Sequence, residues 1–361
     1  MIETAVRWLS KRAPERAFEA FQVEVTSRCN LKCVMCPVTV LAEHWPGRDM
    51  DWATFERAAQ AFGRAKWVYL QGWGEPLLHR RIFDMIERAK QAGCRVGFTT
   101  NGTRLTRATG ARLLAAGLDL LAVSIAGASA ATHEAIRVGS DFGKLLENLR
   151  GFLRQRRGAQ PKVEIFYLMT PANLAELPRA VELAAELGAD ELVATNLDYV
   201  ITPGLDALRA YGEGPPARAL GAALDEARAA ARRTGIAFRP YPLEFREMAV
   251  CDLNPLRILF ISADGDVSPC VYTSLTGQSS IPRVFEGRAL EVPVVRFGNL
   301  NERPLAEIWD SAAYREFRAH FAKRVVGASR MALGVLAGGA ADEEEAPPPE
   351  ACRSCPKLYG V

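Results

Sequence analysis

The sequence predicts an α/β fold built on a parallel sheet, and two observations carry this prediction. From about residue 21 to residue 235, short apolar runs alternate with longer helical patterns, which is typical of βα repeats. The chain has 361 residues, of which 49% are hydrophobic and 24% charged. Such a chain is long and apolar enough for one large domain and a smaller one.

Six strands are predicted, near residues 21–26, 67–71, 94–99, 119–124, 163–168 and 190–195. The helical patterns lie near residues 52–62, 81–92, 106–116, 143–155, 173–187 and 217–234. Six repeats are fewer than the eight of a closed (β/α)8 barrel. Because the loops after the strands carry the chemistry in parallel α/β folds, functional residues are expected in those loops.

The loop after the first strand holds three cysteines, Cys29, Cys33 and Cys36, in the spacing C-x3-C-x2-C. Three thiolates this close can occupy three corners of a cubane iron–sulfur cluster, and soft thiolates favour such clusters or zinc. One iron then lacks a protein ligand and is open to a substrate or cofactor. The alternatives are buried structural thiols or a zinc knuckle with a distant fourth ligand, although structural zinc normally has paired spacings.

This loop resembles the signature of radical S-adenosylmethionine (radical SAM) enzymes, in which C-x3-C-x2-C follows the first strand of a parallel barrel. Here the cysteines follow the strand-like run Phe21-Gln22-Val23-Glu24-Val25. The resemblance implies a partial (β/α)6 TIM-type barrel. It also implies a 4Fe–4S cluster on the three cysteines and S-adenosyl-L-methionine (SAM) as cofactor.

The loop after the second strand is Gln71-Gly72-Trp73-Gly74-Glu75-Pro76. Its closely spaced glycines let a ligand approach the backbone. The loop looks like the Gly-Gly-Glu-Pro motif that holds the amino group of the cofactor in radical SAM enzymes, with Trp73 inserted as a departure. The resemblance therefore implies that Gly72, Trp73, Gly74, Glu75 and Pro76 bind the cofactor, and a tight turn without a ligand is the alternative.

Further candidates follow the next strands, in Thr99-Thr100-Asn101-Gly102 and Ser124-Ile125-Ala126-Gly127. By resemblance, Asn101 and Ser124 lie near the cofactor and Arg137 pairs with its carboxylate, a task that suits a bidentate guanidinium. Met35 is expected to pack on the adenine or to close the core of the cysteine loop. Taken alone, Asn-Gly is usually a turn and a helical arginine is usually solvated. Cys94, which has no cysteine neighbour, is expected to pack in the core.

The C-terminal segment carries a second set of cysteines: Cys251, Cys270 and the pair Cys352-x2-Cys355. Residues 257–268 form a plausible hairpin that returns the chain toward Cys251. Four thiolates complete a site with no open position, as a fully ligated cluster or a structural zinc. This arrangement resembles the twitch domain, a shortened form of the SPASM extension of radical SAM enzymes, which implies a second, auxiliary 4Fe–4S cluster.

The predicted organisation is an amphipathic helix over residues 1–20, the partial barrel over 21–235, and the auxiliary cluster domain over 236–361. A change in composition after Thr234-Gly235 sets the second boundary. The run near 325–350 is rich in alanine and glycine, then acidic, then rich in proline, and is expected to be a flexible insert.

Composition and charge give no support to several classes of function. A net charge of +3 gives no argument for nucleic acid or an anionic membrane as partner. The first twenty residues lack the apolar core of a signal peptide, and no run approaches the ~20 apolar residues of a membrane span. Seven of the eight cysteines have metal-ligand spacing in a chain without a secretion signal, which predicts a reducing cytoplasm.

The resemblance implies a radical SAM oxidoreductase that cleaves SAM to a 5′-deoxyadenosyl radical, which abstracts hydrogen from a substrate carbon. A one-electron donor such as flavodoxin or ferredoxin is implied as partner. The auxiliary cluster suits uptake of the electron left on the substrate, so net oxidation by dehydrogenation or bond formation is expected.

A small biosynthetic intermediate is the expected substrate. About twenty residues precede the barrel, which leaves no room for a leader-binding domain of peptide maturases, and the second domain has the small form. The alternatives are a peptide maturase that makes thioether or carbon–carbon crosslinks, and a non-catalytic metal-binding scaffold. Asp264, Asp252 and Tyr199 are candidate general bases, and their spacing does not select among them.

Overall fold

The computed structural model describes residues 16–212, 216–336 and 346–361, and its centre is a ten-stranded sheet. The six predicted strands all form and lie next to one another, parallel, in sequence order. They are β1 (Phe18–Val23), β3 (Ala65–Tyr69), β4 (Arg95–Thr100), β5 (Leu120–Ile125), β7 (Lys162–Leu168) and β8 (Glu191–Thr195). The prediction of an α/β fold is confirmed.

Two further parallel strands extend this sheet: β9 (Ala237–Pro240) was not predicted, and β10 (Ile258–Ile261) was predicted only as one strand of a hairpin. β9 pairs with β8, and β10 pairs with β1 on the other side. β10 then turns back into β11 (Asp266–Ser268), so the predicted hairpin is present, and β14 (Gly298–Asn299) pairs with β11. The chain beyond residue 235 thus shares the sheet of the barrel, and the boundary there stays a prediction.

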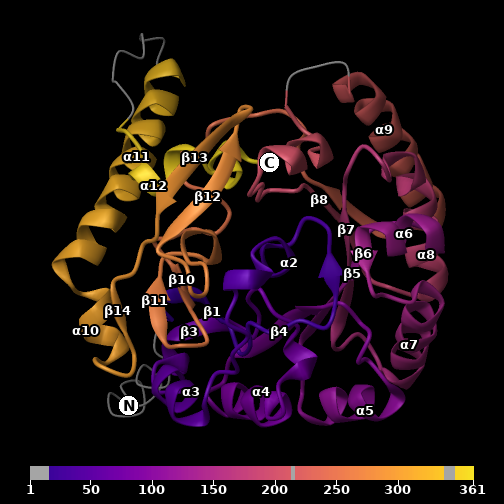
Figure 1. Cartoon of the computed structure of the whole chain (residues 1–361), viewed down its shortest axis with the longest axis horizontal. Helices are drawn as coiled ribbons and strands as arrows, with labels where there is room; N and C mark the ends of the chain where they lie inside the picture. Colours follow the sequence, from indigo (N-terminus) through magenta and orange to yellow (C-terminus); the bar gives the residue numbers. More distant parts are fainter. Residues whose placement is uncertain (1–15, 213–215, 337–345) are drawn as a thin grey trace, which may run out of the picture.

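The helices between the strands cover the outer side of the curved sheet, as Figure 1 shows. They are α3 (Trp52–Ala59), α4 (Ile82–Gln91), α5 (Arg107–Ala115), α7 (Phe142–Gln155), α8 (Leu177–Leu187) and α9 (Pro216–Thr234). Asp51, Thr106 and Asp141 cap three of them through a side chain that accepts a backbone N–H bond, which satisfies a donor free at every helix start. Polar cap residues therefore set where these helices begin.

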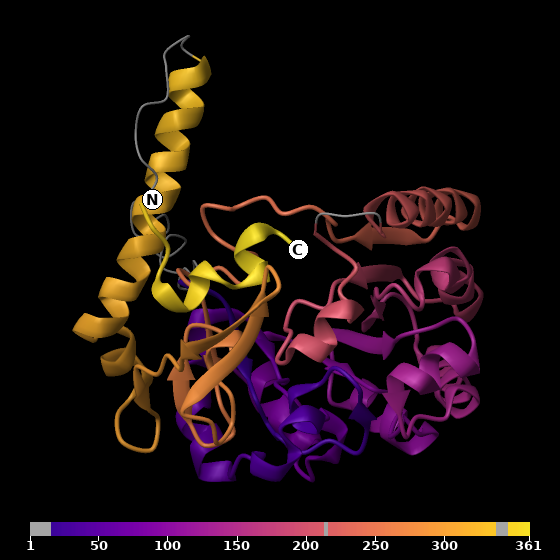
Figure 2. The same cartoon turned by 45° about the horizontal axis from the view of Figure 1, so that its top comes forward.

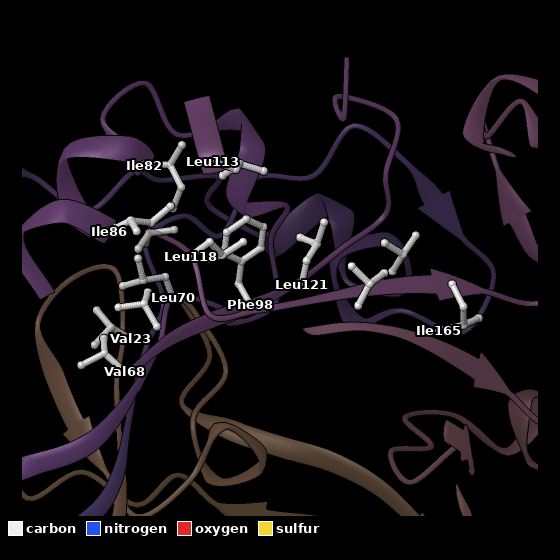
Figure 3. Close-up of a cluster of buried hydrophobic side chains, with 14 of the residues drawn as sticks. Val23, Val68, Leu70, Ile82, Ile86, Phe98, Leu113, Leu118, Leu121 and Ile165 are labelled. Atoms are coloured by element: carbon white, nitrogen blue, oxygen red, sulfur yellow. The ribbon is translucent and has the colours of Figure 1, made fainter. Parts of the chain in front are cut away.

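Apolar side chains join the helices to the sheet (Figure 3). Ile82 and Ile86 lie four residues apart on one face of α4 and are buried with Val68 and Phe98 of the strands beneath. Cys94 is also buried in this core, where its Sγ lies 3.0 Å from the carbonyl oxygen of Phe62. Packing on the outer side leaves the inner strand ends free for other residues.

The C-terminal part lies along one flank of the barrel (Figure 2). It contains the hairpin β12 (Ser280–Phe285) and β13 (Arg288–Pro293), then α10 (Leu305–Trp309), α11 (Ala312–Leu336) and α12 (Glu350–Arg353). Residues 325–336 of the predicted flexible insert are helical, and residues 337–345 are outside the described part.

Of the predicted N-terminal helix, residues 1–15 are likewise outside the described part, while Phe18 to Ala20 belong to β1. Within the described residues, no helix combines the length and apolarity needed to cross a membrane.

Candidate active site

A cavity opens at the carboxyl ends of β1, β3, β4 and β5, where the sequence predicted the site. Eleven of the predicted residues line it: Cys29, Cys33, Met35, Cys36, Gly72, Trp73, Gly74, Glu75, Asn101, Ser124 and Arg137. Pro76 does not, because it is buried at the start of the short helix η3 (Pro76–Leu78). Loops from four strands therefore face one space.

Local backbone pairing fixes the loop that holds Cys29, Cys33 and Cys36, here called the N-terminal cysteines. β2 (Lys32–Cys33) pairs with β6 (Arg137–Val138), which sets Cys33 opposite Arg137. The Cys36 N–H donates to the carbonyl of Cys33 at 3.1 Å, and Cys36 begins the helix α2 (Pro37–Val40). The three thiols and the guanidinium are thus held as one unit.

The guanidinium of Arg137 has an N–H donor without a hydrogen-bond partner among the described residues. Its Nη1 lies 3.9 Å from Sγ of Cys33, and its Nε is buried without a hydrogen-bond partner in the described part of the chain. Leaving a buried donor unpaired costs about 1–3 kcal/mol. A carboxylate bound in the cavity would satisfy this guanidinium and offset that cost.

Burial disfavours free thiolates at the N-terminal cysteines. Desolvation raises the pKa of Cys29, and desolvation together with the nearby Cys33 thiolate raises the pKa of Cys36 to about 12. Metal coordination deprotonates thiols and compensates such buried charge. Three soft thiolate donors fit an iron–sulfur cluster with one open iron.

The side chains do not fit a single ion as well. Among the described residues, no three His, Cys, Asp or Glu side chains are arranged to hold one metal ion. The thiolates of a cubane bind different irons, so they stand further apart than the ligands of one zinc.

The glycine loop after β3 packs directly against the cysteine loop. A Cβ added at Gly74 would lie 2.3 Å from the carbonyl oxygen of Thr26 and 2.6 Å from that of Arg28. The N–H of Glu75 donates to the same Arg28 carbonyl at 2.8 Å. Only glycine allows this approach, so the two loops form one surface.

The carboxylate of Glu75 joins this surface to the loop after β4. It accepts hydrogen bonds from Thr100 Oγ1 at 2.6 Å, from the Asn101 N–H at 2.7 Å and from the Leu77 N–H at 3.1 Å. Burial raises the pKa of Glu75, and these bonds oppose the shift. Both carboxylate oxygens of Glu75 already accept hydrogen bonds. The backbone of the glycine loop is therefore the part of this loop that can bind an amino group.

Sequence reasoning missed Glu24, at the end of β1. Its Oε1 accepts from the Trp73 N–H at 2.9 Å, while its Oε2 accepts from the Ala263 N–H at 3.2 Å and from Thr276 Oγ1 at 3.3 Å. Desolvation raises its pKa to about 7. One buried carboxylate thus fastens the glycine loop to the C-terminal segment. A lone acidic residue at a strand end was the only signal in the sequence.

The four cysteines Cys251, Cys270, Cys352 and Cys355, here called the C-terminal cysteines, line a second, smaller cavity. They come from the stretch before β10, the end of β11 and the last short helices. Desolvation raises the pKa of all four, that of Cys270 to about 11. The structure therefore brings together the set that the sequence predicted, in a place where metal ligation would stabilise the thiolates.

A polar wall connects the two cavities. Asp198 Oδ2 accepts from the Tyr272 hydroxyl at 2.8 Å and pairs with Lys357 Nζ at 2.9 Å, and the Tyr241 hydroxyl donates to Asp252 Oδ2 at 3.2 Å. Burial alone would lower the pKa of Lys357, but the carboxylates raise it above its usual range. Only Asp252 of these five was singled out from the sequence.

Two of the three candidate general bases line the cavity, and the third does not. Asp264 pairs with Arg48 at 2.8 Å and does not line the cavity. Tyr199 and Asp252 do line it. Burial raises the pKa of Tyr199 well above its usual range, so its phenol is a poor base.

Trp73, the residue inserted between the glycines, lies in an aromatic cluster with Tyr199 and Tyr272. The ring centroids are 5.3 Å and 6.0 Å from that of Trp73. Its Nε1–H also donates to the carbonyl of Ser274 at 3.1 Å. The inserted residue thus links the glycine loop to the segment that follows Cys270.

Comparisons with known proteins agree with this geometry. A sequence profile of the Radical SAM superfamily matches residues 23–197, and one of an iron–sulfur cluster-binding domain, SPASM, matches residues 251–356. A tungsten-containing aldehyde ferredoxin oxidoreductase cofactor-modifying protein of Pyrococcus furiosus is 30% identical over 304 residues, 82% of each chain. The chain belongs to the radical SAM superfamily.

Other relatives of this radical SAM protein differ in the reactions they are named for. An AdoMet-dependent heme synthase of Methanosarcina barkeri is 27% identical, covering 82% of this chain and 83% of its own. A PqqA peptide cyclase of Streptomyces rochei is 26% identical, covering 82% and 76%. Streptococcus suis SuiB bound to S-adenosylmethionine has the same fold, with a TM-score of 0.62 and 15% identity over 88% of this chain and 72% of SuiB.

The two matched domains imply two 4Fe–4S clusters and SAM as cofactor. The predictions of a radical SAM enzyme and of a C-terminal cluster domain are therefore confirmed.

Proposed function

We propose that this radical SAM enzyme oxidises a small biosynthetic intermediate. In this proposal the N-terminal cysteines ligate the cluster that binds SAM, and the C-terminal cysteines ligate the auxiliary cluster. One observation carries the proposal: Leu253, Tyr272 and Lys357 line both cavities. A substrate in the larger cavity would thus lie between the two sets of thiols.

When bound, the first cluster and SAM supply a 5′-deoxyadenosyl radical that abstracts hydrogen from the substrate. The chain positions the cofactor for this. Arg137, with its unpaired donor, holds the SAM carboxylate, and the backbone of residues 72–74 holds the amino group. Asn101 and Ser124 face the ribose, and Met35 packs on the adenine. The aromatic cluster around Trp73 would exclude water from this cavity when the cofactor is bound.

Net oxidation, by dehydrogenation or bond formation, is the proposed outcome because the C-terminal cysteines leave no open metal position. Four thiolates suit electron transfer rather than substrate binding. A one-electron donor such as flavodoxin or ferredoxin is the proposed partner.

The relative with 30% identity is named as a cofactor-modifying protein, which supports a small molecule as substrate. The second candidate is a peptide, and the likeness to a PqqA peptide cyclase supports it. A metal-binding scaffold without turnover is the least supported, because it needs no glycine loop pressed against a cysteine loop.

Anaerobic reconstitution tests the proposal. The wild-type protein should hold about eight irons, four in each cluster, and should form 5′-deoxyadenosine from SAM when reduced. Cys29→Ala should lose this activity. Cys94→Ala is the matched control, since Cys94 is buried in the core and lines neither cavity. A colourless protein that contains zinc, or full activity of Cys29→Ala, would refute the proposal.

Candidate small molecules and peptides are then supplied to separate the two substrate classes. Deuterium transfer from a labelled small molecule into 5′-deoxyadenosine supports the first candidate, and transfer from a labelled peptide replaces it with the second.

A further inference from the structure

The polar wall between the cavities consists of Asp198, Asp252, Lys357, Tyr241 and Tyr272, and all five line the larger cavity. Its charged groups are one ammonium and two carboxylates. Lys357 Nζ lies 2.9 Å from Asp198 Oδ2 and 3.9 Å from Asp252 Oδ2. The wall therefore has an excess of one negative charge.

The carboxylates, and not the ammonium, face the open side of the wall. The side chain of Lys357 is 7% exposed, against 18% for Asp198 and 50% for Asp252. The two bonds to Asp198 both fall on Oδ2, and its Oδ1 accepts no hydrogen bond from the described residues. The wall offers free carboxylate oxygens and almost no positive charge.

The other charged residues that line the cavity do not balance this excess. They are Glu75 and Arg137. The carboxylate of Glu75 is occupied by three donors. Arg137 lies beside Cys33, at the cofactor end. The next cation, Arg283, is fully buried behind the wall, where its Nη2 donates to the Tyr272 carbonyl at 3.1 Å, and it does not line the cavity. The surface of the cavity next to the C-terminal cysteines therefore presents an excess of carboxylates.

We propose that Asp198 and Asp252 bind a positively charged amino group of the substrate. This rests on the proposed function and names the substrate class: an amine, rather than a polyanion such as a nucleoside triphosphate or a polycarboxylate. A cation finds two carboxylate partners in a partly desolvated wall, whereas an anion there meets like charge and is repelled.

The position of the wall adds to the argument. Asp252 directly follows Cys251, Tyr272 lies two residues after Cys270, and Lys357 lies two residues after Cys355. An amino group bound by these carboxylates would place the rest of the substrate against the C-terminal site. The same residues thus orient the substrate and select one that carries a positive charge.

The test measures retention of three probes that share one aromatic ring: benzylamine, benzyl alcohol and benzoate. Equilibrium dialysis is performed anaerobically on the reconstituted, SAM-loaded protein. We expect benzylamine to be retained at least about tenfold better than benzoate, with benzyl alcohol between them. In the double variant Asp198→Asn, Asp252→Asn this ratio should fall below about threefold, because the charges are gone while the shape is kept.

Asp225→Asn is the matched control, since this residue pairs with Arg228 on the surface of α9 and its side chain is 78% exposed. It should keep the wild-type ratio. Retention of benzoate equal to or above that of benzylamine, no retention of benzylamine, or an unchanged ratio in the double variant would overturn the inference. Formation of 5′-deoxyadenosine by the same samples reports separately on the proposed function. A protein that cleaves SAM but does not prefer the amine refutes this inference alone.

Discussion

The two sets of cysteines are built in different ways. The N-terminal cysteines lie within residues 29–36, a single loop that holds a local bond from the Cys36 N–H to the Cys33 carbonyl and pairs with β6. The C-terminal cysteines span residues 251–355 and meet only because distant segments pack together. The two sets lie near each other because their cavities share Leu253, Tyr272 and Lys357. A local site is visible in a sequence, whereas this dispersed site was inferred from the pair Cys352-x2-Cys355, a hairpin and a family resemblance.

Their surroundings differ as well. The N-terminal cysteines face a large cavity beside a guanidinium with an unpaired donor. The C-terminal cysteines enclose a small cavity and are largely buried among apolar neighbours such as Phe317 and Phe321. The first surroundings suit ligand binding, and the second suit a closed metal centre.

Replacing one cysteine in each set with alanine should give the largest difference between the two sites. Cys33→Ala should abolish formation of 5′-deoxyadenosine, because the open cluster is lost. Cys270→Ala should lose about four irons yet still form 5′-deoxyadenosine, while product formation stops. Iron analysis measures the cluster content, and chromatography measures 5′-deoxyadenosine and the product formed from the substrate. Equal loss of SAM cleavage in the two variants would contradict the division of roles.

Gly74→Ala tests whether the glycine loop is shaped by the cysteine loop. The added methyl would meet two backbone carbonyls at 2.3 Å and 2.6 Å, and a shifted loop should reduce SAM cleavage about 100-fold. Gly63→Ala is the control, since a Cβ there meets nothing within 4 Å. The expected result is near wild-type activity for the control, and equal activity of both variants would count against the packing argument.

The pH dependence of stability tests the link that Glu24 makes between the glycine loop and the C-terminal segment. Its pKa is raised by burial to about 7, so the neutral form is favoured in the folded protein. The stability that this gives is complete below the ordinary pKa of a glutamate and is lost as the pH rises through about 7. From pH 4.5 to pH 8 the loss should be about 3 kcal/mol relative to Glu24→Gln, which does not titrate.

Urea unfolding of the two proteins across this pH range measures the difference. Parallel pH profiles for the wild-type protein and Glu24→Gln would show that Glu24 does not titrate as described.

Trp73→Phe should have the smallest effect. The ring remains, but the bond from Nε1 to the Ser274 carbonyl is lost, at a cost of about 1 kcal/mol in unfolding free energy. Denaturant unfolding checks this value. A loss of several kcal/mol would mean that Trp73 does more than link the loops.

The six strands, the N-terminal cysteines and the glycine loop were predictable because each depends on residues close in sequence. β10 was read only as half of a hairpin, since nothing in its sequence specifies its parallel pairing with β1. Glu24 and Asp198 were missed for the same reason: their partners lie 49 or more residues away. Pro76 was assigned to the cofactor site from its motif, but it is buried at the start of η3.

The central claim is that only the N-terminal site keeps an open metal position, and electron paramagnetic resonance tests it most directly. SAM is added anaerobically to the reduced, reconstituted protein and to Cys270→Ala. We predict that SAM shifts the g values of the signal that survives in Cys270→Ala and leaves the other wild-type signal unchanged. Two signals that both ignore SAM, or a shift confined to the signal lost in Cys270→Ala, would contradict the account.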